Sequence, residues 1–130
     1  MGYHFDFSRA HNIVRMSFDG RLDDATLFEG YAASSTHALS HPGCSGIVDF
    51  SSVTHFEVTA GAVSRLAHHP PLLPVDAARI LVAPQDLVYG MARMFQMKTE
   101  QKRPALQIVR KMEEAYALLG IESPEFIPLG

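Results

Sequence analysis

The first 20 residues alternate between apolar and polar side chains. Tyr3, Phe5 and Phe7 alternate with polar residues, and the alternation resumes over residues 14–18 after a short polar connection. A period of two is typical of a β-strand with one buried face and one solvated face. The two segments therefore predict an antiparallel hairpin whose second strand ends at Gly20.

Helical spacing replaces this alternation after the hairpin. Asp23 or Asp24 is suited to cap a helix, because a carboxylate accepts hydrogen bonds from free backbone N–H groups. An apolar stripe follows at helical spacing over residues 27–39, with Leu39 as its last member. Residues 41–43, with their proline and glycine, predict the end of the helix.

Three further helices are predicted from the same kind of pattern. Thr59 is a suitable cap for a short helix, which the proline-rich residues 70–74 follow as an extended linker. Asp86 lies in the first turn of the next helix, where a carboxylate suits the helix dipole. The last stripe begins at Met112 and ends at Gly120, a residue suited to the left-handed C′ position.

Short apolar runs separate these helices. Residues 46–50, 79–83 and 105–109 are typical of strands that are buried on both faces, and Phe50 is expected between the sheet and a helix. Residues 123–130 are expected to form a surface tail. The order ββαβαβαβα predicts an α/β fold with a mixed sheet, in which a starting hairpin precedes parallel strands with right-handed crossovers. Because one face of the hairpin is polar, we expect helices to cover one side of the sheet more fully than the other at the hairpin end.

Composition narrows the class of protein. The chain has 130 residues, of which 47% are hydrophobic and 19% charged, so we expect a single domain over residues 1–130 rather than a disordered chain. The net charge of −3 gives no general attraction to nucleic acid or acidic membranes. A single cysteine excludes an internal disulfide. Neither a signal peptide nor a membrane span is visible, which predicts a cytoplasmic protein.

Four stretches carry a resemblance to a known family. The chain resembles the STAS fold of the SpoIIAA-type anti-sigma-factor antagonists, and more closely the bacterial SpoIIAA-like (STAS/SEC14) family of small stand-alone proteins. This resemblance covers residues 3–120 and implies a regulatory or ligand-binding module without enzymatic activity; it leaves a homodimer open. The stretches are residues 18–22, 47–54, 88–93 and 112–115.

The resemblance also implies a phosphorylation site. In the antagonists, an acidic residue, two serines and a glycine follow the third strand, and a partner kinase phosphorylates one serine. Here the stretch is Glu57, Val58, Thr59 and Ala60. Valine cannot carry phosphate, so Thr59 becomes the candidate phosphoacceptor. Its alternative role is that of a helix cap.

Polar residues gather where the predicted strands end. Open α/β sheets bind ligands outside the carboxyl ends of their strands, so these residues predict a small binding rim. The alternative is that they cap turns and satisfy backbone donors. The candidate rim consists of Asp49, Ser51, Ser52, His55, Glu57, Thr59, Gln85 and Asp86.

A basic segment lies between residues 93 and 111. It holds six basic residues and one acid, Glu100. Some of the cations suit helix carboxyl ends, but together they also predict a patch for an acidic partner or for weak, salt-dependent contact with anionic membranes. Interleaved aromatic residues are absent, which argues against nucleic acid. The patch consists of Arg93, Lys98, Lys102, Arg103, Arg110 and Lys111.

Catalytic and metal signatures are weak. Seven histidines are present, with His37 and His41 four residues apart, but no HExxH or cysteine-pair pattern accompanies them. Cys44 lies near His41 in sequence, yet neither a nucleophile elbow nor a glycine-rich phosphate loop is present. We therefore expect no metal, no cofactor and no enzymatic activity.

Two functions remain open. The first is regulation through a protein partner, in the manner of an anti-sigma-factor antagonist. The alternative is a carrier or sensor of a small apolar or amphipathic, lipid-like ligand, with contact to a membrane surface. A cavity between the helices and the sheet would favour the ligand, whereas a solid core with a flat exposed rim would favour the partner.

Overall fold

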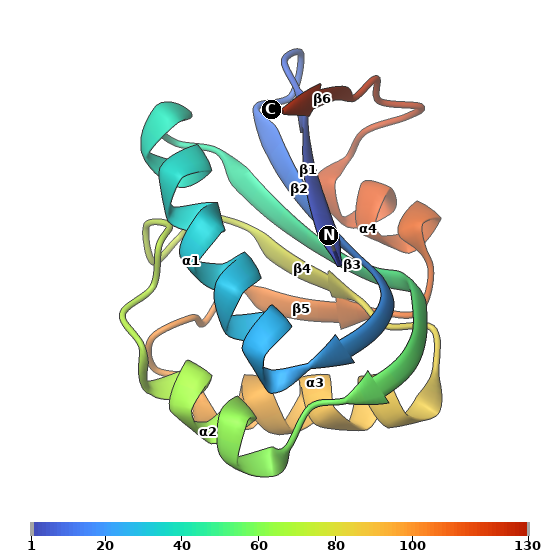
Figure 1. Ribbon diagram of the computed structural model, residues 1–130. Helices are drawn as coiled ribbons and strands as arrows, with labels where there is room; N and C mark the ends of the chain where they lie inside the picture. The colour runs from blue at the N-terminus through green and yellow to red at the C-terminus, as the bar shows by residue number, and fades with distance from the viewer. Residues whose placement is uncertain (1, 130) are drawn as a thin grey trace.

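A mixed β-sheet forms the centre of the molecule, with helices on both faces (Figure 1). The computed structural model describes residues 2–129, which form six strands in the order β5-β4-β3-β2-β1-β6 and four helices. Strands β2 to β5 are parallel, whereas β1 is antiparallel to both β2 and β6. The elements are β1 (Tyr3–Ser8), β2 (Ile13–Asp23), α1 (Asp24–Ser40), β3 (Ser45–Glu57), α2 (Ala60–His68), β4 (Arg79–Val82), α3 (Asp86–Lys98), β5 (Leu106–Val109), α4 (Met112–Leu119) and β6 (Ile127–Leu129).

The predicted hairpin is confirmed, but its second strand is longer than expected. Tyr3 pairs with Phe18 and Ser8 with Ile13 in an antiparallel ladder. The prediction that β2 ends at Gly20 is wrong, because β2 continues to Asp23. Gly20 adopts a φ of 68°, which a glycine does at little steric cost, so the strand bends there and goes on.

Strand β3 is also longer than its apolar run. The sequence predicts a strand over residues 46–50, whereas β3 extends from Ser45 to Glu57. Its second half pairs with the extended part of β2, as far as Asp23 opposite Glu57. The register shifts twice along this ladder, so the strand bends away from its first half. The polar residues after Phe50 therefore belong to a strand and not to a loop.

The helix caps are those expected. Asp23 accepts a hydrogen bond from the backbone N–H of Thr26 at 2.9 Å. Gly120 ends α4 with a φ of 68°, the left-handed conformation. The expectation that Leu39 lies on the buried stripe of α1 is wrong, since this side chain is 83% exposed. The buried residues of α1 are Leu27 and Gly30, in its first two turns, so the later part of the stripe lacks a packing surface.

The helices divide unequally between the two faces of the sheet (Figure 1). Helices α1, α2 and α3 cover one face and enclose the main core, whereas α4 covers the first part of β2, β3 and β4 on the other. Phe50 is buried in the main core, as expected, and its ring stacks on Phe18 with a centroid separation of 5.6 Å. The predicted unequal cover of the sheet is thus confirmed.

The carboxyl-terminal segment does not form the expected surface tail. Residues 127–129 form β6, which pairs antiparallel with β1 at the edge of the sheet. Phe126 anchors the segment, because its ring lies 3.8 Å below the Arg15 guanidinium and stacks near Tyr116. Within residues 2–129, none of the helices combines the length and apolar character that a membrane span requires.

Candidate functional site

The first part of the candidate rim lies along β3. The Asp49 carboxylate accepts hydrogen bonds from the backbone N–H and the hydroxyl of Ser51, at 3.0 and 2.6 Å. Ser52 is exposed and pairs with Asp19 of β2. These residues were expected in a loop. As parts of a strand they are spaced along the sheet, and Asp49 and Ser51 meet because they share one face.

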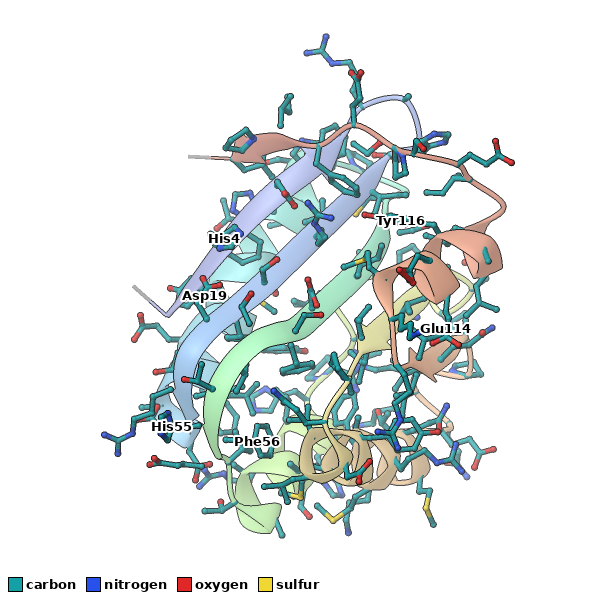
Figure 2. The ribbon with its side chains drawn as sticks, turned by 90° about the vertical axis from the view of Figure 1, so that its right-hand side faces the viewer. His4, Asp19, His55, Phe56, Glu114 and Tyr116 are labelled. Atoms are coloured by element: carbon teal, nitrogen blue, oxygen red, sulfur yellow. The ribbon has the colours of Figure 1, made fainter. Side chains whose placement is uncertain are left out.

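The next two members of the rim make separate contacts. His55 shares a hydrogen bond of 3.1 Å with its neighbour Thr54, and Figure 2 shows it at the end of β3, beside Phe56. Glu57 forms an exposed ion pair with Arg21 of β2 at 2.8 Å. Exposed pairs of this kind contribute little to stability.

Thr59 is the N-cap of α2, as the sequence predicts. Its hydroxyl accepts from the backbone N–H of Ala62 at 3.2 Å and donates to the Asp24 carboxylate at 2.7 Å. The Thr59 backbone N–H donates to the other Asp24 oxygen at 2.8 Å. A phosphate on Thr59 would lie against a carboxylate, where like charges repel. Its role as phosphoacceptor stays a prediction.

The last two members of the rim contact different partners. Gln85 donates from Nε2 to the backbone carbonyl of Val53 at 2.7 Å, which ties the start of α3 to β3. Asp86 pairs with Arg110 at 2.8 Å, and the Arg110 guanidinium also lies 4.0 Å from the ring centroid of Tyr89. The members of the rim thus bind different partners, among them Arg21, Asp24 and Arg110.

The basic segment does not form the expected surface patch in full. Arg103 is only 5% exposed, so its place in a surface patch is a wrong expectation. The segment between α3 and β5 folds inward at this residue, which becomes part of the interior. Arg93 donates to Gln96 at 2.7 Å and Lys102 to the carbonyl of His68 at 2.7 Å. Lys98 and Lys111 are exposed.

An apolar cavity of about 200 Å³ lies between the sheet and helices α1, α2 and α3. It exists because α1 packs mainly on β2, which leaves space above β3 and β4. Aromatic and aliphatic side chains make up most of the wall, so an apolar molecule would find matching surroundings. The wall includes Phe18, Phe50, Leu66, Leu73, Val88 and Phe95.

Tyr31 and Arg103 are polar members of the cavity wall, and Arg103 also contacts the buried Thr99. Arg103 donates from Nη1 to the Thr99 hydroxyl at 2.6 Å, and from Nη2 to the Tyr31 hydroxyl and the His69 carbonyl, each at 3.1 Å. Tyr31 in turn donates to the carbonyl of Pro70 at 2.8 Å. This network holds α1 against the segment that follows α2.

Arg79 is the second buried arginine of the cavity wall, and it is 7% exposed. It donates to backbone carbonyls of residues 73–77, among them Pro74 at 2.8 Å and Ala77 at 3.1 Å. Burial, and then the positive charge of Arg103, lower the pKa of Arg79; Tyr31 and Asp76 act in the opposite direction. Arg79 pairs with Leu106, whose backbone N–H donates to the Arg103 carbonyl at 3.2 Å, so the two arginines lie near one another.

This polar end lies where the parallel strands begin. Gly46 of β3 pairs with Arg79, the first residue of β4, and Arg79 pairs with Leu106, the first residue of β5. The sequence predicts the site at the opposite, carboxyl ends of these strands. Arg79 was missed because it opens an apolar strand. Arg103 was predicted on the surface because it lies in a basic run, and neither position indicates an inward side chain.

The face of the sheet that α4 covers in part carries a separate polar network (Figure 2). Arg15 of β2 binds the Asp6 carboxylate with two hydrogen bonds, at 2.9 and 2.6 Å, and also donates to the Tyr116 hydroxyl at 2.9 Å. Burial raises the pKa of Tyr116. His4 and Asp19 lie side by side on β1 and β2, with 3.0 Å between their polar atoms. These groups bind one another directly.

The histidines and the cysteine are placed by packing. His37 and His41 lie against Phe5 and Phe7, with ring centroids 4.4 and 4.0 Å apart. Over residues 2–129, the structure groups no three histidine, cysteine or acidic side chains as metal ligands would require. Cys44 is buried in the cavity wall, and burial raises the pKa of its thiol, which keeps it protonated.

Comparisons with protein-family models, curated proteins and solved structures find no match to this chain. The feature that carries most functional information is therefore the cavity itself, an apolar space with a positively charged end.

Proposed function

We propose that this protein is a binding module, without chemistry of its own, that carries or senses a small apolar or amphipathic molecule. The observation that supports this function is the cavity of about 200 Å³ between the sheet and the helices. Protein interiors are close-packed, and an apolar cavity of about 150 Å³ is already large enough to bind benzene. A cavity of this size is unusual in a close-packed core, and it is large enough to hold a small ligand.

The fold assignment belongs to the same proposal. The chain is proposed to be a STAS-like domain of the SpoIIAA-like type, and the element order and the parallel strands β2 to β5 support this relationship. Regulation through a protein partner would require an available rim. Several rim residues already bind side chains of the same chain, namely Asp24, Arg21 and Arg110. The rim therefore supports a protein partner less well than the cavity supports a ligand.

The test uses octan-1-ol, a neutral apolar probe. Titration into isotopically labelled protein should give saturable NMR shifts at cavity residues such as Phe50 and Cys44. Ala38, on the cavity side of α1, offers a way to block the space, and Ala38→Phe should abolish these shifts. The matched control is Ala32→Phe on the exposed side of the same helix, which should bind as the wild type does.

Two results would overturn the proposal. One is the absence of saturable shifts at cavity residues in the wild type. The other is equal binding by the wild type and a folded Ala38→Phe variant, since the probe would then bind elsewhere. Native mass spectrometry of protein purified without denaturant adds a direct observation, because a retained small molecule would appear as a defined mass increment.

A further inference from the structure

Two buried arginines share one end of the cavity without an acidic partner. Neither Arg79 nor Arg103 forms an ion pair within residues 2–129, although both line the cavity and are almost wholly buried. Arginine cannot give up its proton in a protein, so each retains a full positive charge. The end of the cavity therefore carries two like charges in surroundings of low polarity.

Such an arrangement is costly as it stands. A buried charge is usually paired, because removal from water is only partly offset by neutral hydrogen-bond partners. Here the acceptors are neutral: Arg103 binds Thr99, Tyr31 and backbone carbonyls, and Arg79 binds backbone carbonyls alone. Asp76, the nearby acid, is exposed and forms no ion pair with Arg79.

The hydrogen-bond geometry leaves donors for a ligand. The bonds that hold both guanidinium groups all start from Nη1 and Nη2. Within the described residues, no hydrogen bond starts from Nε of Arg79 or Arg103, and neither atom is fully enclosed, so both can be reached. Tyr31 adds a hydroxyl that already contacts Arg103 at 3.1 Å. An anionic oxygen at this place would receive charge-assisted hydrogen bonds, which are about twice as strong as neutral ones.

We propose that the cavity binds a small amphipathic acid, with its apolar tail among Phe18, Phe50 and Phe95 and its anionic head at Arg79 and Arg103. This inference rests on the proposed function and adds the chemical class of the ligand. Charge complementarity selects an anion, since a cationic head would meet two positive charges. The volume limits the tail to a short chain or a single ring, comparable in size to ligands of cavities of about 150 Å³.

The experiment compares four probes that each contain a single chain of eight carbons. Octanoate, octyl phosphate, octan-1-ol and octylamine are titrated into the full chain by calorimetry, below their critical micelle concentrations. We expect octanoate or octyl phosphate to bind at least about tenfold more tightly than octan-1-ol, as charged hydrogen bonds allow, and octylamine to bind more weakly than the alcohol. The ranking of octanoate against octyl phosphate distinguishes a carboxylate head from a phosphate head.

Variants locate the head group. Arg103→Gln should remove the preference for the acid while the affinity for octan-1-ol stays within about twofold, because a lost charge-assisted bond affects only the anion. Arg93→Gln, an exposed arginine of α3, is the matched control and should keep the preference. Tyr31→Phe should reduce the preference in part. If circular dichroism shows that Arg103→Gln fails to fold, the affinities of the four probes for the wild type and for Tyr31→Phe test the anionic head group instead.

The outcomes separate the two proposals. If octan-1-ol binds the wild type as tightly as both acids, the anionic head is overturned, whereas the carrier function stands. If a folded Arg103→Gln variant keeps the full preference for the acid, the two arginines are braces of the backbone and the head group is also overturned. If none of the four probes binds in the cavity, the proposed function fails as well.

Discussion

Phe50 shows how one aromatic side chain can both support the core and border an empty space. Its ring stacks on Phe18, and it also forms part of the cavity wall. Phe50→Ala should lower the free energy of unfolding by roughly 3 kcal/mol, at the lower end for such truncations because one side of the ring already lacks packing partners. Urea denaturation measures this, with Phe50→Leu expected to lose less. A loss below about 1 kcal/mol would contradict the burial of this ring.

His37 provides a pH dependence. Burial, and then the charge of His41, lower the pKa of His37 below the ordinary value of 6.5. In the window just below this value, the unfolded chain binds more protons than the folded one, so the free energy of unfolding should decrease as the pH falls through it. Denaturation across this range should show a shallower slope for His37→Gln. An identical slope in both proteins would contradict the lowered pKa.

At this scale, the sequence predicts apolar residues better than charged ones. The apolar run that contains Phe50 was enough to predict its burial, since an apolar side chain in a continuous run has few other places to lie. Arg103 was assigned to the surface because a charged residue is seldom fully buried. Its burial depends on acceptors from Tyr31, Ala67 and His69, which are remote in sequence.

At the scale of elements, α1 approaches the sheet through a glycine. A Cβ added at Gly30 would lie 2.9 Å from the Phe18 ring, so the helix could not keep its position. Gly30→Ala should cost about 1–3 kcal/mol, typical of overpacking. Gly90 in α3 is the matched control, because a Cβ there meets no atom within 4 Å. Gly90→Ala should raise stability by about 0.5–1 kcal/mol, since alanine favours helix more than glycine does.

Thermal and urea denaturation of both variants test this difference. Equal changes in stability for Gly30→Ala and Gly90→Ala would show that helix propensity alone determines both effects. Close packing of α1 on Phe18 would then be contradicted.

Elements with strong periodicity were predicted well, and those that depend on a partner strand were not. The hairpin and the four helices follow from local pattern and capping residues such as Asp23 and Thr59. The second half of β3 has a polar, loop-like sequence and is a strand only because β2 continues beside it. Likewise β6 contains a proline and forms because β1 leaves an edge open. A single segment carries no information about such partners.

At the scale of the whole molecule, α1 is less firmly held than the sheet. Its packing is concentrated on β2, and its buried residues are Leu27 and Gly30. Hydrogen exchange should therefore be faster in α1 than in residues 13–17 of β2 and 46–49 of β3, whose backbones are paired on both sides. If the cavity is filled by octanoate, exchange in α1 should slow down. Equal protection of α1 and β3 in the free protein would contradict this view.

The position of the candidate site could not be predicted from strand order alone. The general rule places ligands at the carboxyl ends of parallel strands. Here the buried Arg79 of the cavity wall lies beside residues 46 and 106, at the amino ends, where the segment after α2 adds Leu72 and Leu73 to the wall. The polar residues of the candidate rim favoured the carboxyl ends of the strands, but in the structure they bind other polar residues such as Arg21, Asp24 and Arg110.

Strand β6 also bears on how the molecule behaves in a concentrated solution. An exposed sheet edge is a template on which another chain can add a strand, the usual first step of edge-to-edge aggregation. β6 covers the edge that β1 would otherwise expose, and it is only three residues long with Pro128 at its centre. Proline has no N–H to donate, so a strand approaching from outside finds an incomplete ladder. The terminal strand thus protects the sheet from self-association at this edge.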